Sequence, residues 1–343
     1  MTVDIKSLTR EQLKSEVAAL GCPAFRAAQI SDWLDNGCTS FDAMTNLPLS
    51  LREQLKERFT IPSVKILRKL QSQLDETVKY LFELSDGNTV ESVLMKYKHG
   101  WSQCLSTQVG CRMGCAFCAT GMDGLARNLL PAEMLAQIEA AQQDHDIRVS
   151  SIVLMGMGEP LDNYDNVLRF LQMLSQEGGV HIGMRHVSLS TCGIVTGIRR
   201  LMDEKLQLTL SISLHAPNNQ IRSRIMPINR RWPVEELLEV CREYVQVTGR
   251  RISFEYAMMN GVNDSDACAL ELAARLKGML CHVNLIPANE VAGKEHRRST
   301  AQRLKQFQTI LEKQGINVTV RRTLGADISA SCGQLRRQQR EEE

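Results

Sequence analysis

VSSIVLMGMGEPLDNYDNVLRFLQMLSQ, residues 149–176, contains the clearest strand–turn–helix unit in the chain. Residues 149–155 form a largely apolar run, which is typical of a strand buried in a parallel sheet. A glycine-rich turn follows at residues 156–160, and from Tyr164 to about Gln176 the apolar residues recur at helical spacing. The stretch therefore predicts one βα unit of an α/β fold.

The same alternation continues through the C-terminal half of the chain. Further strands are expected at residues 186–190, 206–214, 252–257, 282–286 and 317–321, with helices at 198–204, 234–247, 267–277 and 300–313. A run of about six such units predicts a partial (β/α)6 barrel rather than a closed eight-fold one. Polar residues at the carboxyl ends of these strands are then the candidates for a site, because chemistry sits at that end of such folds.

The residues before the barrel have a different character. Residues 1–60 contain helical periodicity interrupted by Gly21-Cys22-Pro23, Asn36-Gly37 and Pro48, and predict a helical accessory domain. In residues 61–100, alternating residues 78–84 and a return strand at 89–97 flank Asp86-Gly87, which predicts an antiparallel hairpin extension. The core is expected to span residues 101–325, followed by a C-terminal segment, 326–343, whose charged end predicts fraying.

Bulk composition bounds the class of protein. With 43% hydrophobic and 23% charged residues, no run of 18 apolar residues and a charged N-terminus, the 343-residue chain is expected to be cytoplasmic and not membrane-bound. A net charge of +2 neither favours nor excludes nucleic acid. Eleven cysteines without an export signal disfavour a disulfide framework and favour ligand or redox chemistry.

The cysteines concentrate in Cys111-Arg-Met-Gly-Cys115-Ala-Phe-Cys118. Three thiolates on one short loop can bind three irons of a [4Fe–4S] cluster and leave the fourth iron open for catalysis. Two alternatives are a zinc site that also uses Cys104 and a chance group of reduced core cysteines. A zinc-stabilised RNA-binding module would give colourless protein containing zinc, whereas the cluster enzyme would give brown, oxygen-sensitive protein.

This C-x3-C-x2-C pattern, with Phe117 before its last cysteine, resembles the radical S-adenosylmethionine (radical SAM) superfamily. The wider sequence resembles the RlmN/Cfr family of adenine methyltransferases, and the matching segments occur in the family's order over nearly the whole chain. They are Gln108–Cys111, Phe117–Gly121, Arg127–Leu129, Met155–Pro160, Ser190–Gly193, Ser213–Pro217, Met226–Asn229, Asn284–Pro287 and Cys332–Leu335.

The resemblance implies a pocket for S-adenosylmethionine. Its implied ligands are Gly158, Glu159, Ser190, Ser213, Leu214, His215 and Asn289. Glycine before Glu159 allows close approach of backbone to a ligand, and the carboxylate can accept a hydrogen bond from an ammonium group. The alternative for each position is a polar strand-end cap, and a lone histidine is more often structural.

The resemblance also implies a radical route, which suits adenine because its C2 and C8 carbons are electron-poor and do not attack a methyl cation donor. Cys332 would be methylated by one S-adenosylmethionine. A second, reduced at the cluster, would give a 5′-deoxyadenosyl radical that activates this methyl group for addition to adenine. Cys104 would resolve the protein–RNA adduct as a disulfide, and Glu91 would accept the proton. The alternatives are a buried Cys332 in a tail loop and a solvated Glu91.

The implied substrates are an adenine of 23S rRNA at the peptidyl transferase centre and, as a further candidate, tRNA. An electron donor such as flavodoxin is implied, and the protein is expected to be monomeric. Asn163–Asn166 and Cys281–Leu285 favour methylation at C2; Phe117–Gly121 and Gly100-Trp101 favour the alternative, Cfr-like C8 methylation that confers antibiotic resistance. We favour C2.

Paired arginines are the candidates for RNA phosphate contacts. They are Arg230-Arg231, Arg297-Arg298, Arg321-Arg322 and Arg336-Arg337, although such pairs are more often solvated. Only 5% of the residues are aromatic, which disfavours a broad platform for stacking bases. Recognition of RNA shape, with one base displaced into the pocket, fits better.

Overall fold

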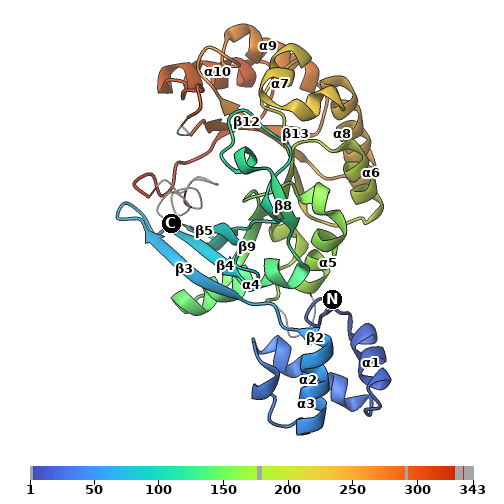
Figure 1. The fold of residues 1–343 in the computed structure, drawn as a ribbon. Coiled ribbons are helices and arrows are strands. Elements are labelled where there is room, and N and C mark those ends of the chain that lie inside the picture. The colour runs from blue at the N-terminus through green and yellow to red at the C-terminus, as the bar shows by residue number, and fades with distance from the viewer. Residues whose placement is uncertain (1–2, 176–179, 290–292, 329–334, 336–343) are drawn as a thin grey trace.

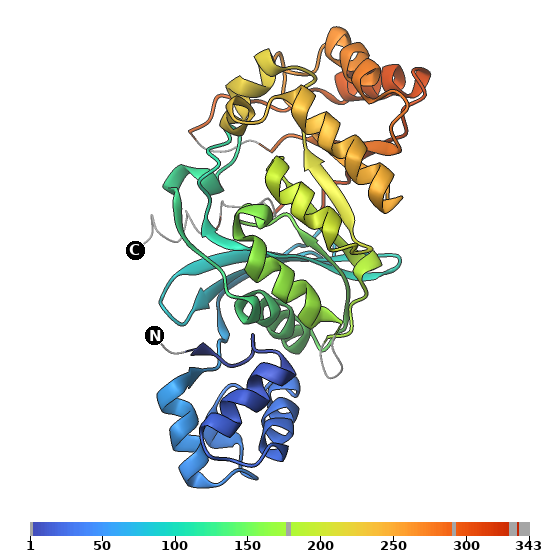
Figure 2. The ribbon, with the colours of Figure 1, turned by 90° about the vertical axis from the view of Figure 1, so that its right-hand side faces the viewer.

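The protein was analysed as a computed structural model that describes residues 3–175, 180–289, 293–328 and Leu335. Its N-terminal lobe stands apart below the sheet in both views (Figures 1 and 2). The lobe has its own apolar core, which includes Val17, Ile30 and Leu55. It consists of β1 (Val3–Asp4), α1 (Arg10–Ala19), α2 (Phe25–Asp35), the 3₁₀ turn η1 (Phe41–Ala43), α3 (Leu49–Arg58) and β2 (Phe59–Thr60). The predicted helices of this region are confirmed.

The lobe is tied to the rest of the molecule by a few polar contacts. Lys6 Nζ lies 2.6 Å from a carboxylate oxygen of Glu139. Arg169 donates from Nε to the carbonyl of Ser7 and from Nη2 to the carbonyl of Leu8, each at 2.6 Å. These bonds join the backbone just before α1 to two helices that pack on the main sheet.

The main sheet has ten strands in the order β14-β13-β12-β11-β10-β9-β6-β5-β4-β3. β6 and β9 to β14 run parallel, whereas β3 to β6 pair antiparallel. The strands are β3 (Val64–Gln71), β4 (Val78–Leu84), β5 (Thr89–Tyr97), β6 (Gly100–Cys104), β9 (Val149–Leu154), β10 (Val187–Thr191), β11 (Thr209–Ser213), β12 (Ile252–Met258), β13 (Cys281–Pro287) and β14 (Val318–Val320). Since β14 and β3 are opposite edges, the sheet is open, which confirms the predicted partial barrel.

Helices follow the parallel strands, and Figure 1 shows α5, α6 and α8 along the outer side of the sheet. They are α4 (Pro131–His145), α5 (Tyr164–Leu174), α6 (Val195–Asp203), α7 (Asn219–Ile225), α8 (Val234–Thr248), α9 (Asp266–Leu276) and α10 (Ala301–Lys313). The sequence did not predict α4 and α7. Much of the surface of α4 is buried, including polar Glu133 and Gln137, so its sequence lacks a clear apolar stripe. The polar helix α7 has only seven residues.

The predicted hairpin is present as β4 and β5, but it belongs to the main sheet. β5 pairs with β6, and β6 pairs in parallel with β9, so the antiparallel strands extend the barrel sheet without a break. The sequence did not predict β6, because the residues at the buried centre of this strand are polar. The amide nitrogen of buried Gln103 has two partners: Nε2 donates to the carbonyl of Gln137 at 2.8 Å and to Ser92 Oγ at 2.9 Å.

The turn after β9 lies directly on the segment after β6. Gly156 N donates to the carbonyl of Leu105 at 3.0 Å, and Thr107 N donates to the carbonyl of Met157 at 2.8 Å. A Cβ atom at Gly156 would lie 2.5 Å from the Leu105 carbonyl oxygen. The two backbones approach this closely only because residue 156 has no side chain.

We therefore expect Gly156→Ala to reduce the free energy of unfolding by about 1 to 3 kcal/mol, because the new methyl group overpacks against fixed backbone. Gly183→Ala is the matched control, since its Cβ would meet nothing nearer than 4.0 Å. Urea unfolding of both variants measures the difference. Equal stabilities would show that the 105–108 backbone yields and does not constrain the turn.

Candidate functional site

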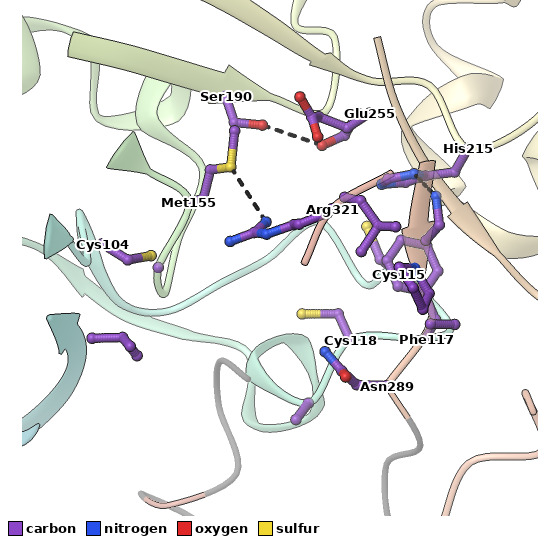
Figure 3. A pocket seen from close by; sticks show the side chains of 18 of the residues that line it. Cys104, Cys115, Phe117, Cys118, Met155, Ser190, His215, Glu255, Asn289 and Arg321 are labelled. Carbon is purple, nitrogen blue, oxygen red and sulfur yellow. Dashed lines mark hydrogen bonds between the residues drawn. The ribbon is translucent and has the colours of Figure 1, made fainter. Parts of the chain in front are cut away.

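A cavity of about 530 Å³ lies at the carboxyl ends of the parallel strands. Figure 3 shows side chains from several strands and from the cysteine loop converging on it. The predicted site residues that line it are Cys104, Cys111, Cys115, Cys118, Gly158, Glu159, Ser190, Ser213, His215 and Asn289. Segments up to about 185 residues apart in the sequence thus supply one cavity.

Two of the predicted site residues that the structure describes, Leu214 and Glu91, do not line the cavity. Leu214 is fully buried, and its N–H donates to the carbonyl of Glu255 at 3.2 Å. Glu91 is buried on β5 in an ion pair with Lys79 Nζ at 3.1 Å, so it is not on a solvated face. Cys332 lies outside the described residues.

The loop that carries Cys111, Cys115 and Cys118 is fixed at both sides. Cys111 N donates to the carbonyl of Gly124, and Ala116 N donates to the carbonyl of Ile225, each at 2.8 Å. Gly114 has a φ of +67°, a conformation that favours glycine at this turn. The loop therefore presents its three sulfur-bearing side chains to the cavity from one short segment.

The cysteine loop fits a cluster better than a single ion. Burial raises the pKa of the Cys111 thiol to about 12 and raises that of Cys115 as well, and the thiolates of this loop raise it further by mutual repulsion. The charges of the three thiols therefore act on one another, and all three side chains line the same cavity. Three thiolates from one short loop are a suitable ligand set for three irons of a cubane. A zinc site completed by Cys104 gains no support.

Glu159 is almost fully buried at the cavity wall. Its Oε1 accepts from Leu161 N at 3.0 Å, and its Oε2 accepts from Cys192 N at 2.7 Å. Burial raises the pKa of this carboxyl, while these backbone hydrogen bonds lower it. Each oxygen retains a lone pair, so Glu159 can still accept a hydrogen bond from a cationic ligand.

His215 is a neutral donor. Ala257 N donates to its Nδ1 at 3.0 Å, so the ring hydrogen is on Nε2. Burial, with a further effect from the positive charge of Arg222, lowers the pKa of His215 to about 3. The ring of Phe117 packs edge-on against it with 5.0 Å between centroids. The residue also has a φ of +55°, which only a firmly held backbone maintains.

The structure adds Glu255 to the cavity. Its two carboxylate oxygens accept from Ser253 Oγ and Asn284 Nδ2, each at 2.7 Å, and the carboxylate is buried. Ser213 lies beside Glu255 in the register of β11 and β12, and its hydroxyl is 3.4 Å from that of Ser190. Glu255 is the only charged residue of β12 (Ile252–Met258), and this was the signal in the sequence that could have identified it.

Basic side chains also line the cavity. Arg298, Arg321 and Arg322 contribute to its wall, together with His296. Arg321 points across the cavity, with its Nη1 3.9 Å from the Met155 sulfur (Figure 3). Two of the four predicted arginine pairs thus reach the cavity, whereas Arg336-Arg337 lies outside the described residues.

Known protein families match both the barrel and the N-terminal lobe of this chain. The sequence model of the Radical SAM superfamily covers residues 105–273, and that of the ribosomal RNA large subunit methyltransferase N-terminal domain covers residues 3–61. Proteins named "Probable dual-specificity RNA methyltransferase RlmN" from Alkaliphilus oremlandii and Clostridium novyi are 51% and 50% identical; the matches cover 98% and 97% of this chain and 98% of each relative.

A solved structure has the same fold over its full length. The crystal structure of a radical SAM methyltransferase from Sphaerobacter thermophilus matches with a TM-score of 0.90 and 45% identity. The match covers 97% of this chain and 98% of that one. The N-terminal lobe and the open barrel therefore occur together in that protein too.

The buried neutral His215 predicts that the free energy of unfolding decreases at low pH. Because its folded pKa of about 3 lies below the ordinary value of 6.5, the unfolded chain binds this proton first. Its effect is absent above pH 6.5, and stability falls as the pH decreases from there toward 3. We use His215→Asn for comparison, because asparagine tolerates a positive φ. Between pH 7.5 and 5, the free energy of unfolding of this variant should fall by about 2 kcal/mol less than that of the native chain. Urea unfolding at both pH values measures this, and parallel losses would refute it.

Proposed function

The chain belongs to the RlmN family of radical SAM methyltransferases, and we propose that it methylates C2 of an adenine in 23S rRNA. Membership of the radical SAM superfamily brings a [4Fe–4S] cluster and S-adenosylmethionine as cofactors. The observation that carries the proposal is 51% identity to a protein named RlmN over 98% of the chain. The match of residues 3–61 to the N-terminal domain of large-subunit rRNA methyltransferases supports 23S rRNA.

We further propose tRNA as a second substrate, which is in keeping with the words "dual-specificity" in the relatives' name. The same names favour C2 over the Cfr-like C8 alternative. Within the described residues, no helix is both long and apolar enough to cross a bilayer. We expect a monomeric enzyme that acts in the cytoplasm with an electron donor such as flavodoxin.

The cavity residues divide into a cluster-binding group and a cosubstrate-binding group. Cys111, Cys115 and Cys118 would hold the cluster, which together with S-adenosylmethionine supplies an adenosyl radical for hydrogen abstraction. The remaining wall orients the cosubstrate. Glu159 accepts from an ammonium group, and His215 donates from Nε2. Ser190, Ser213, Asn289 and the backbone at Gly158 and Leu214 complete the proposed binding set.

Three further residues would handle the methyl group and the proton. Cys332 would carry the methyl carbon and join it to adenine C2. Glu91 would accept the C2 proton, and the one electron left on the ring would pass to the cluster, the one-electron carrier of the site. The Cys104 thiolate would then attack the Cys332 sulfur. An S–S bond forms, the S–C bond breaks, and its electron pair remains on carbon, which is protonated to methyl. Two observations support these roles: Cys104 lines the cavity, and Glu91 is buried beside Lys79 Nζ at 3.1 Å.

The polarity of the cavity supports an anionic macromolecule at one side. The carboxylates in its wall, Glu159 and Glu255, are buried with 4% and 3% exposure. Arg298 and Arg322 are exposed, and among the described residues neither makes an ion pair. Unpaired exposed guanidinium groups beside a cavity suit phosphates of an RNA that places one base inside.

The product test uses reconstituted enzyme, reductant, S-adenosylmethionine and an rRNA fragment. The native enzyme should yield 2-methyladenosine by mass spectrometry of the digested RNA. Cys104→Ala should instead accumulate a covalent protein–RNA adduct, because it lacks the thiol that releases the product. Cys281→Ala, at the opposite end of the barrel strands, is the matched control and should turn over normally.

Each result is decisive for a separate part of the proposal. 8-Methyladenosine would replace the C2 assignment with C8. Normal turnover by Cys104→Ala would remove this thiol from product release. Absence of any methylated adenosine with rRNA and with tRNA would overturn the substrate assignment.

We expect Arg298→Ala and Arg322→Ala each to weaken RNA binding. Each should also reduce the magnitude of the slope of log affinity against log salt concentration by about 1, which corresponds to the loss of one phosphate contact. Arg242→Ala is the control, because Arg242 is exposed on α8, away from the cavity. Fluorescence anisotropy of labelled rRNA over a salt series provides the slopes. If the two cavity variants match Arg242→Ala, these arginines do not contact phosphate.

A further inference from the structure

Arg222, on α7, is fully buried and donates to four neutral acceptors. Its Nε donates to the carbonyl of Leu214 at 3.1 Å, and its Nη1 donates to Asn229 Oδ1 at 3.1 Å. Its Nη2 donates to the carbonyl of Cys192 at 2.6 Å and to that of Ser213 at 3.3 Å. Among the described residues the structure gives this guanidinium hydrogen bonds but no carboxylate partner.

A buried cation without an anion is costly. Removing a charge from water costs several kcal/mol or more even after relaxation. Burial lowers the pKa of Arg222 accordingly, although a guanidinium still remains protonated. Neutral donors could make hydrogen bonds to three carbonyls and an amide without this cost. The positive charge itself therefore needs a nearby anion.

The groups whose negative charge acts on Arg222 are cysteine thiols, Cys192 first and then Cys115 of the cysteine loop. Ala116 N donates to the carbonyl of Ile225, the last residue of α7, so the loop docks on the helix that carries Arg222. The charge of Arg222 lowers the pKa of the Cys115 thiol, which partly offsets the effect of burial. Arg222 also holds the backbone of Cys192 and Ser213, two residues that line the same cavity as Cys115.

We infer that Arg222 provides the fixed countercharge for the cluster-binding thiolates and thereby raises the reduction potential of the cluster. A cubane held by three thiolates is anionic, and reduction adds one more negative charge. A fixed cation nearby therefore stabilises the reduced form more than the oxidised form. Arg222 is a positioning residue in this scheme, because it acts through the cluster and the strand ends and touches neither substrate.

The inference depends on the cluster alone and not on the RNA substrate. It is tested by redox titration of the anaerobically reconstituted full chain with a low-potential one-electron reductant, followed by electron paramagnetic resonance of the reduced cluster. Arg222→Gln should shift the midpoint to a more negative potential. Arg222→Lys should remain closer to the native value, because it keeps the charge while losing most of the hydrogen bonds. An unshifted Arg222→Gln, or equal shifts in both variants, would overturn the inference.

A second pair of variants decides the matter if Arg222→Gln does not hold a cluster. Asn229→Asp keeps the acceptor 3.1 Å from Arg222 Nη1 but adds a negative charge beside it. It should move the midpoint in the same negative direction with Arg222 intact. Asn229→Ala is the control, since it loses the Asn229 bonds to Asn219 and Ser223 without adding charge. Equal midpoints in Asn229→Asp and Asn229→Ala would contradict the countercharge role.

Because no RNA is present in either titration, a failed methylation assay leaves the interpretation of these potentials unchanged.

Discussion

The site depends on one close approach of backbone, where residues 156–159 lie on residues 105–108. Gly156 and Gly158 make this approach possible: Cβ atoms there would lie 2.5 Å from the Leu105 carbonyl and 2.6 Å from Gln108 Cβ. Gln108 Oε1 then accepts from Glu159 N at 2.9 Å, which sets the direction of the Glu159 side chain. The cysteine loop begins three residues after Gln108, so the same contact fixes the proposed cluster-binding segment relative to the proposed cosubstrate-binding turn.

The part of the site that sequence reveals is the part built from consecutive residues. The cysteine loop at 111–118 and the glycine turn at 156–160 can be recognised from consecutive residues, because ligand spacing and backbone freedom are local properties. The six parallel strands β9 to β14 were predicted for the same reason, since each is a short apolar run between turn residues.

The features that the sequence did not reveal are those that depend on packing between distant segments. Arg222 and Glu255 look like ordinary charged residues of a helix and a strand, and only the fold shows that both are buried beside the cavity. β6 was not predicted because its buried polar residue Gln103 finds partners for its amide nitrogen on β5 and α4, which lie 11 and 34 residues away. Burial of polar side chains therefore marks the positions where the tertiary structure overrides the local pattern.

The carboxylates of the cavity wall are buried, whereas two of its arginines are exposed. Glu159 and Glu255 are buried and held by hydrogen bonds, and the Lys79–Glu91 pair is sealed within the sheet, whereas Arg298 and Arg322 are exposed. Fields are weakly screened inside and strongly screened at the surface. Buried carboxylates can therefore select a small cation such as a sulfonium, while exposed arginines attract a polyanion without drawing it inside. Arg222, buried among neutral acceptors, is the exception, and an anionic cluster beside it would restore the balance of charge in the interior.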